Sequence, residues 1–221
     1  MLTEHEISTT AKGTVAVYAI DLDGDGDTDV LAATQTDDEI VWYENDGNQV
    51  FTDHFITTSA DGARGVFAID LDGDGDTDVL SASQLDNKIA WYENDGSDVF
   101  TTHVITTAAT KAFTVFAIDL DGDNDIDVLS ASEGEISWYE NDGSQVFTQH
   151  VIDTGIEQAY SVYAIDFDGD GDIDVLSGWK VGMRMMVVKY LLSILSQLLL
   201  FQIQLLLPLQ LISTEMEILT C

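Results

Sequence analysis

Aspartates stand at every second position of one short stretch of the sequence, "DLDGDGDTD" at residues 21–29. If the chain curls, carboxylates at this spacing can aim several oxygens at one point. Oxygen donors without His or Cys suit Ca²⁺, which accepts about six to eight oxygen ligands in flexible geometry. The interposed Gly24 and Gly26 let the backbone turn tightly. The stretch therefore predicts a loop that binds a calcium ion.

The same loop occurs four times. "AIDLDGDGDTDVL" stands at 19–31 and 68–80, and close variants follow at 117–129 and 164–176. In the third copy Asn124 replaces the second glycine, and we expect the turn to survive because Asn tolerates the left-handed conformation. Five like charges this close repel strongly unless a cation joins them. An acidic solvated loop, or a surface adapted to high salt, is the alternative, but such charge runs need neither fixed spacing nor glycines.

The loops belong to a repeat that organises residues 1–178. Successive loops begin 49, 49 and 47 residues apart. A second block, "WYENDG", keeps step at 42–47, 91–96 and 138–143. A third block, "VFTDHFITT" at 50–58, returns twice, and the start of the chain, "LTEHEISTT", matches it. The chain therefore opens midway through a repeat.

Each repeat contains four short segments rich in β-branched and aromatic residues. In the first repeat they predict strands at 15–20, 29–34, 39–44 and 50–57. Asp/Gly loops and an Asn-Asp-Gly turn separate the segments, and no stretch before residue 179 has a convincing helical pattern. Four strands in roughly 48 residues is the size of one β-propeller blade, and a solenoid is the alternative, although parallel β-helix repeats are usually shorter. We therefore expect an all-β fold, a partial β-propeller of about three complete blades and parts of others.

The loops, "DVLSAS" and "WYENDG" make residues 2–178 resemble FG-GAP repeats of the VCBS-like kind, similar to the calcium-binding blades of the integrin alpha-subunit amino-terminal propeller. The resemblance implies about four calcium ions, one per loop. It implies that loop positions 1, 3, 5 and 9 give carboxylates and position 7 a backbone carbonyl. The implied side-chain ligands are Asp21, Asp23, Asp25, Asp29, Asp70, Asp72, Asp74, Asp78, Asp119, Asp121, Asp123, Asp127, Asp166, Asp168, Asp170 and Asp174, and the implied backbone ligands are Asp27, Asp76, Asp125 and Asp172.

The charge of the chain limits its partners. There are 41 acidic and 7 basic residues, and 39 of the acidic ones lie in residues 1–178. Such a body repels nucleic acid and anionic membranes, so we expect neither as a partner. The resemblance implies a module that binds a protein or carbohydrate ligand outside the cell or at its surface, in adhesion, with calcium acting structurally. The start of the chain lacks the features of a signal peptide.

One histidine and one tryptophan recur with the repeat. They are His5, His54, His103 and His150, and Trp42, Trp91 and Trp138. A catalytic histidine is normally singular, so one per repeat predicts a structural role. We expect the tryptophans to pack between blades, with a sugar-stacking platform as the alternative. No Ser/His/Asp or Cys/His set stands outside the repeat, so we expect no enzyme activity. The rival hypothesis is a fragment of a propeller-containing enzyme that acts on polysaccharides.

Residues 179–221 differ from the rest in composition. They carry five charged side chains, and 190–212 is uncharged and long enough to span a membrane. A membrane-anchored surface protein is therefore a further alternative. However, glutamines interrupt the segment, and Lys180, Arg184 and Lys189 before it would keep the acidic repeats in the cytoplasm.

A frameshift explains this hydrophobic tail better than a membrane span. Read one base earlier, codons for residues 182–190 can give Trp-Tyr-Glu-Asn-Asp-Gly-Ser-Gln-Ile, the second block of the repeat. Met-Met-Val in one frame forces Asp-Gly in the other. Residues 210–221 can likewise give the Asp-rich loop. We therefore hypothesise a one-base shift near residues 177–182, which leaves 179–221 without a native fold; other codons in the gene would remove the hypothesis.

Overall fold

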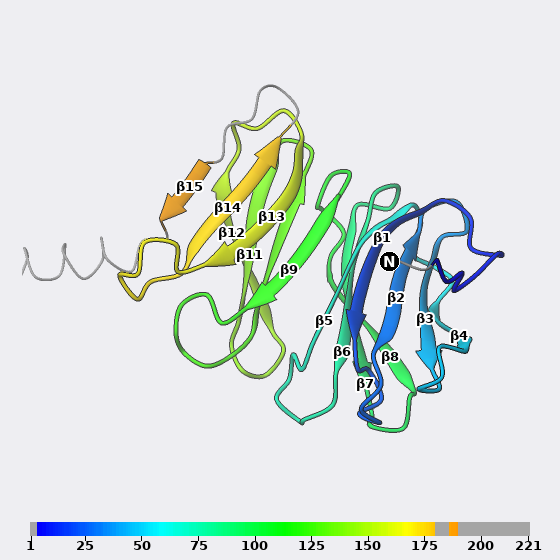
Figure 1. The fold of residues 1–221 in the computed structure, drawn as a ribbon. Helices are drawn as coiled ribbons and strands as arrows, with labels where there is room; N and C mark the ends of the chain where they lie inside the picture. Colours follow the sequence, from blue (N-terminus) through cyan, green and yellow to red (C-terminus); the bar gives the residue numbers. More distant parts are fainter. Residues whose placement is uncertain (1–3, 180–185, 190–221) are drawn as a thin grey trace, which may run out of the picture.

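The computed structural model describes residues 4–179 and 186–189. Within these residues the secondary structure consists of strands, and no helix is present. The strands form four antiparallel sheets in chain order, each made of consecutive strands (Figure 1). The all-β prediction is therefore confirmed for the described part of the chain.

Each sheet is one repeat of the sequence. Blade 1 contains β1 (Thr14–Ile20), β2 (Asp29–Thr34), β3 (Glu39–Asn45) and β4 (Phe51–Thr57). Blade 2 contains β5 (Ala63–Ile69), β6 (Asp78–Ser83), β7 (Lys88–Asn94) and β8 (Phe100–Thr106). Blade 3 contains β9 (Thr114–Ile118), β10 (Asp127–Ser132), β11 (Glu135–Asn141) and β12 (Phe147–Asp153). Blade 4 contains β13 (Ala159–Ile165), β14 (Asp174–Trp179) and β15 (Met186–Lys189).

The four strands expected in the first repeat agree with β1 to β4 to within one residue at each end. Short runs of β-branched and aromatic residues produce them, and Asp/Gly segments end them. In blade 1 the hairpin between β3 and β4 is closed by the pair Asn45–Phe51 and by the N–H of Asp46, which donates to the carbonyl of Val50 at 3.1 Å. The same bond recurs in blades 2 and 3.

The blades are arranged around their first strands. β1 contacts β5, β5 contacts β9, and β9 contacts β13. Figure 1 shows the sheets side by side in chain order, with these first strands facing one another. Successive four-stranded sheets that meet at their first strands are the arrangement of a β-propeller.

The hydrophobic core lies between blades. In the first interface Leu31, Ile40 and Trp42 of blade 1 pack with Val66 and Tyr92 of blade 2. Equivalent residues form the clusters between blades 2 and 3 and between blades 3 and 4. Each blade thus has a forward face, which packs on the next blade along the chain, and a rear face, which packs on the preceding one.

Among the described residues blade 4 contains three strands. β14 pairs with β13 and with β15, and Val175 lies opposite Val188. No helix in the described residues is long and apolar enough to cross a membrane. The proposed span at 190–212, and almost all of the segment that the frameshift hypothesis concerns, lie outside the described residues.

Candidate metal centre

Each Asp-rich loop joins the first strand of a blade to the second. In blade 1 Ile20 pairs with Asp29, and this pair closes the loop of residues 21–28. Equivalent pairs close the other loops; they are Ile69–Asp78, Ile118–Asp127 and Ile165–Asp174. Because the blades repeat one topology, the four loops lie at the same end of the molecule.

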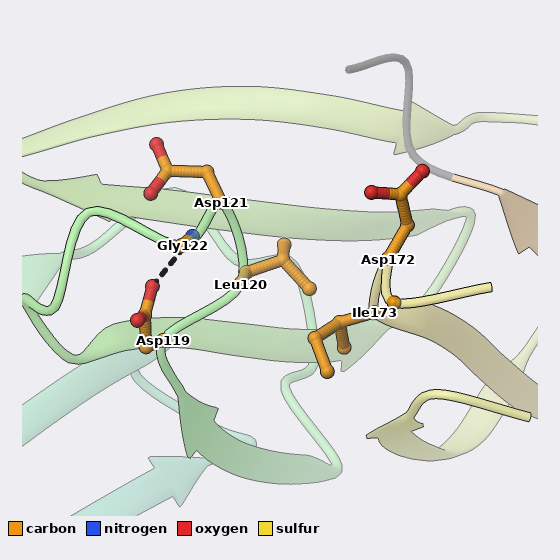
Figure 2. Close-up of a pocket in the computed structure, with 7 residues that line it drawn as sticks. Asp119, Leu120, Asp121, Gly122, Asp172 and Ile173 are labelled. Carbon is orange, nitrogen blue, oxygen red and sulfur yellow. Dashed lines mark hydrogen bonds between the residues drawn. The ribbon is translucent and has the colours of Figure 1, made fainter. Parts of the chain in front are cut away.

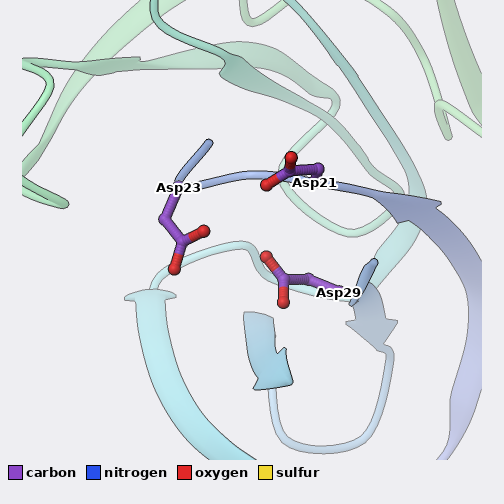
Figure 3. A group of neighbouring side chains, drawn as sticks. All are labelled: Asp21, Asp23 and Asp29. Atoms are coloured by element: carbon purple, nitrogen blue, oxygen red, sulfur yellow. The ribbon is translucent and has the colours of Figure 1, made fainter. Parts of the chain in front are cut away.

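Three aspartates of each loop converge. One carboxylate oxygen from each of the first, third and ninth positions lies within 4.8 Å of the others. Figure 3 shows the three carboxylates of the first loop turned toward one another. The four groups are Asp21, Asp23 and Asp29; Asp70, Asp72 and Asp78; Asp119, Asp121 and Asp127; and Asp166, Asp168 and Asp174.

A backbone hydrogen bond folds each loop back on its first aspartate. In blade 1 the N–H of Gly26 donates to Oδ2 of Asp21 at 3.0 Å. The N–H five residues on makes the same bond in the other loops, from Gly75, Asn124 and Gly171. Gly26 has a φ of 96° and Asn124 a φ of 79°. Asn124 therefore adopts the left-handed conformation that the sequence predicted for it.

The ninth aspartate is buried and held at both oxygens. In blade 2 Asp78 accepts the N–H of Leu71 at Oδ2, at 2.9 Å, and the N–H of Asn94 at Oδ1, at 2.8 Å. Asp29 and Asp127 accept the equivalent pairs of bonds. Each oxygen retains a second lone pair that can face a cation. The carboxylate thus ties the loop to the end of the third strand.

Burial makes these carboxyl groups weaker acids than usual. Burial raises the pKa of Asp78 to about 7, although the N–H groups of Asn94 and Leu71 oppose the shift. Burial likewise raises the pKa of Asp127 to about 6. At the third loop position, the pKa values of Asp72 and Asp121 are also raised, again chiefly by burial. A bound cation would favour the charged forms and lower these pKa values.

The fifth and seventh positions lie outside the converging groups. The carboxylate of Asp25 accepts the N–H of Asp27 at 2.8 Å, and the equivalent bond recurs in the other loops. The carboxylate of Asp27 lies directly against Gly47, where an added Cβ would collide with it. The carboxylate at the seventh position of loop 1 thus turns toward the Asn-Asp-Gly turn.

The converging groups fit a hard divalent cation. Their donors are carboxylate oxygens alone, and in blade 1 the buried Oδ1 of Asp21 accepts no hydrogen bond from the described residues. A buried acceptor without a partner is costly. Three carboxylates, backbone oxygens and water can together supply the oxygen ligands that Ca²⁺ prefers.

Sequence reasoning missed the asparagine of the "WYENDG" block. In blade 1 the backbone N–H of Asn45 donates to Asp29, and its Nδ2 donates to the carbonyl of Thr28 at 3.1 Å. Its Oδ1 accepts the N–H groups of Gly47 and Gln49. Asn141 makes the four corresponding bonds, and Asn94 makes those to the loop and to the N–H of Gly96. The available signal was that this block follows each of the first three loops, with its asparagine 16, 16 and 14 residues after the ninth aspartate.

The repeated histidines of three blades make the same two contacts, which agrees with the structural role that the sequence predicts for them. His54 stacks on Trp42 with ring centroids 4.6 Å apart, and its Nε2 lies 2.6 Å from Oε2 of Glu44. His103 and His150 repeat both contacts.

The tryptophans of the second block confirm the prediction that they pack between blades. Trp42, Trp91 and Trp138 are buried, and each belongs to an interface cluster. A sugar-stacking platform needs an exposed ring face, so the burial rules out that alternative for these three residues.

Neighbouring loops face one another across the blade boundaries. A pocket of about 260 Å³ lies between the loop of blade 3, including Asp119 and Asp121, and that of blade 4, including Asp172 and Ile173 (Figure 2). Smaller pockets occupy the equivalent places between blades 1 and 2 and between blades 2 and 3. A cation in one loop would therefore lie beside the loop of the next blade.

The comparison with protein families agrees with this geometry. A model of the FG-GAP-like repeat matches residues 21–81, 70–130 and 119–177, so each match spans two successive loops. The chain belongs to the FG-GAP-like repeat family. A comparison with curated proteins finds no match.

Solved structures similar to this FG-GAP-like repeat chain share its fold. A lectin from Agrocybe aegerita, studied for specific recognition of non-reducing terminal N-acetylglucosamine, has a TM-score of 0.55 at 14% identity; the match covers 80% of this chain and 50% of the lectin. BBS1N, solved in complex with ARL6DN, has a TM-score of 0.56 at 13% identity, covering 81% of this chain and 56% of BBS1N. The FG-GAP-like repeat chain thus spans about half the length of these proteins.

Proposed function

We propose that each Asp-rich loop binds one Ca²⁺ ion and that the ions serve to stabilise the fold. The observation that carries the proposal is the convergence of three carboxylates at the same place in all four repeats. A calcium ion supplies positive charge that offsets their mutual repulsion. The buried ninth aspartate and the N–H donor to the first aspartate hold the carboxylates in place before the ion arrives.

The ligand set that we propose extends beyond the converging groups. The carboxylates of the fifth position and the backbone carbonyls of the seventh would complete it, as the family resemblance implies. The contact between Asp27 and Gly47 supports a backbone role for the seventh position, because it turns this carboxylate away from the group. The fifth position would have to reorient its carboxylate when the ion binds.

We propose further that the calcium-bound module binds a protein or carbohydrate ligand outside the cell, in adhesion, and has no catalytic role. The repeat family and the propeller fold support a binding module. Calcium-binding modules with weak sites suit the millimolar calcium of the extracellular space. The large negative charge argues against nucleic acid as the partner. A glycan array probed with the calcium-loaded chain separates the two ligand classes, because binding there shows a carbohydrate ligand and its absence favours a protein.

Calcium binding is tested on the full chain by metal analysis after dialysis and by melting with and without a chelator. We expect about four calcium ions per chain and a higher melting temperature with calcium, because binding to the folded state stabilises it. No bound metal and an unchanged melting temperature would overturn the proposal.

A matched pair of variants locates the ions. Asp72→Asn removes one converging carboxylate, whereas Asp53→Asn makes the same charge change on the exposed surface of β4. We expect Asp72→Asn to lower the calcium count by one and Asp53→Asn to leave it unchanged. Equal counts in the two variants would place the ions elsewhere.

A further inference from the structure

We propose that Asp98 of blade 2 supplies a further carboxylate to the calcium ion in the loop of blade 1. This ion would then link two blades, and it would be held more tightly than the ion in the loop of blade 2. The inference rests on the proposed calcium binding of the loops. It goes further because it assigns a ligand that lies outside every loop and makes the sites unequal.

Asp98 lies in the turn between β7 and β8, beside the loop of the preceding blade. It lines the pocket of about 80 Å³ between blades 1 and 2, together with Asp21 and Asp23 of the first converging group. A volume of this size has room for a cation and a bridging water. Carboxylates from two blades therefore border one place.

The charge of Asp98 acts on this converging group. Burial is the main cause that raises the pKa of Asp23, and the N–H of Asp25 opposes the shift. Three carboxylates add to the rise in this pKa; those of Asp29 and Asp25 belong to the same loop, whereas that of Asp98 belongs to the next blade. A negative charge that acts on Asp23 also attracts a cation bound beside it.

The residue at this turn position differs between blades 2 and 3. The turn of blade 2, "NDGSDVF" at 94–100, and the turn of blade 3, "NDGSQVF" at 141–147, differ only in Asp98 and Gln145. Gln145 lines the equivalent pocket between blades 2 and 3, together with Asp70 and Asp72. The loop of blade 2 therefore faces a neutral amide where the loop of blade 1 faces a carboxylate.

The backbone of the turn does not require an aspartate. Asp98 has a φ of 61°, a left-handed conformation that Asp adopts more readily than most residues. However, Gln49 and Gln145 adopt the same conformation in their own turns, with φ values of 66° and 57°. A further carboxylate in a pocket that aspartates already line increases repulsion unless a cation is present. A calcium ion gives the charge of Asp98 a favourable partner.

The first aspartate of loop 1 also differs from its counterparts. In the other three loops its Oδ1 accepts the N–H three residues on, at 2.8 Å from Gly73, 2.7 Å from Gly122 and 2.7 Å from Gly169. Oδ1 of Asp21 is buried and accepts no hydrogen bond from the described residues. A buried acceptor without a partner is costly, and a cation in the pocket that Asp21 lines would satisfy it.

The test exchanges the two turn residues in the full chain and measures calcium affinity by calorimetric titration. Asp98→Gln gives the turn of blade 2 the sequence that blade 3 already folds, so the turn should keep its structure. We expect one of the sites to weaken by about tenfold with the number of ions unchanged, because calcium affinity depends on the number of charged ligands. Gln145→Asp should strengthen one site by a similar factor.

Asp61→Gln is the matched control. It removes the same charge from an exposed position just before β5, at the end of the blade opposite the Asp-rich loops. Its calcium affinities should equal those of the wild type. Equal weakening by Asp61→Gln and Asp98→Gln would overturn the proposal, because the effect would then come from net charge alone.

A double-variant cycle assigns the effect to loop 1. In a chain whose first site is disabled by Asp23→Asn, Asp98→Gln should cause no further loss of calcium affinity. A further loss there overturns the proposal, and so does an unchanged affinity in Asp98→Gln alone. Both of these results leave calcium binding by the loops intact, whereas a wild-type chain that binds no calcium overturns the proposed function as well.

Discussion

At the scale of single residues, the aspartate that begins the second strand of each blade has two tasks. Asp78 lies at the convergence of three carboxylates, and it also accepts N–H groups from Leu71 and Asn94. Both tasks favour a negative charge, but the carboxylate that performs them is buried. Burial penalises the charge. We therefore infer that the buried carboxylate of Asp78 favours binding either a proton or a cation.

The calcium-free chain should therefore lose stability from Asp78 as the pH rises. Its pKa is about 7 in the folded chain against an ordinary value of 3.8. A raised folded pKa contributes stability that is fully present below the unfolded value, here near pH 4, and is lost as the pH rises through about 7. The measurement is the free energy of unfolding in urea with a chelator at about pH 5 and pH 8.

The variant Asp78→Asn isolates this effect, because it cannot ionise. Without calcium, we expect the wild type to lose unfolding free energy relative to the variant between about pH 5 and about pH 8. With calcium present we expect the relative stability to shift in favour of the wild type instead, because the ion needs the carboxylate. A difference that stays constant with pH in the chelated samples would contradict the prediction.

At the scale of elements, each loop depends on the third strand of its own blade. The last residue of that strand in blades 1 to 3 is the asparagine of "WYENDG", which bonds to the loop through backbone and side chain. The fourth loop keeps the bond from the N–H of Phe167 to Asp174. The sequence after it contains no fourth copy of that block.

Asn94→Ala should loosen the loop of blade 2 while leaving β7 intact. The substitution removes the bond from Nδ2 to the carbonyl of Thr77 and the acceptor for the N–H of Gly96. We expect a loss of about 1–2 kcal/mol in unfolding free energy and weaker calcium binding at one site. Unfolding in urea and calcium titration measure the two effects.

Asn48→Ala is the control for this prediction, because Asn48 lies in an exposed turn and bonds only locally to Asp46. Its effect on calcium affinity should be negligible. If the two variants weakened calcium binding equally, the asparagine at the end of the third strand would have no special part in holding the loop.

At the scale of the whole molecule, repulsion among like charges opposes folding. The net charge is −34 at pH 7, and such self-repulsion destabilises a compact chain. Four calcium ions would remove part of it where the charge is most concentrated. We infer that calcium acts both at each loop and on the chain as a whole.

Salt should therefore stabilise the calcium-free chain more than the calcium-bound chain. Raising the ionic strength from about 0.05 M to about 0.5 M shortens the range of charge repulsion and should raise the melting temperature of the chelated sample by the larger amount. Thermal melting at both salt levels measures this. Choline chloride is the control, because its cation cannot occupy the loops; a gain seen only with sodium chloride would indicate ion binding instead of screening.

The sequence by itself determined the repeat, the strands and the loops. The alternating aspartates with Gly24 and Gly26 predicted a curled acidic loop, and Asn124 was correctly expected to keep the turn. Strand positions followed from short β-branched and aromatic runs between Asp/Gly segments. These features depend on local backbone preferences, which neighbouring residues set and which repetition makes easy to see.

Only the tertiary structure decided which of the similar aspartates converge and which surfaces stay open. In sequence Asp74 and Asp78 are both members of one alternating series, yet Asp78 is buried beside the half-buried Asp70 and Asp72, whereas Asp74 is exposed. Val17 and Val66 occupy the same place in their repeats and differ only in whether a preceding blade covers them. Burial depends on contacts between residues far apart in the chain, and a local sequence pattern does not predict those contacts.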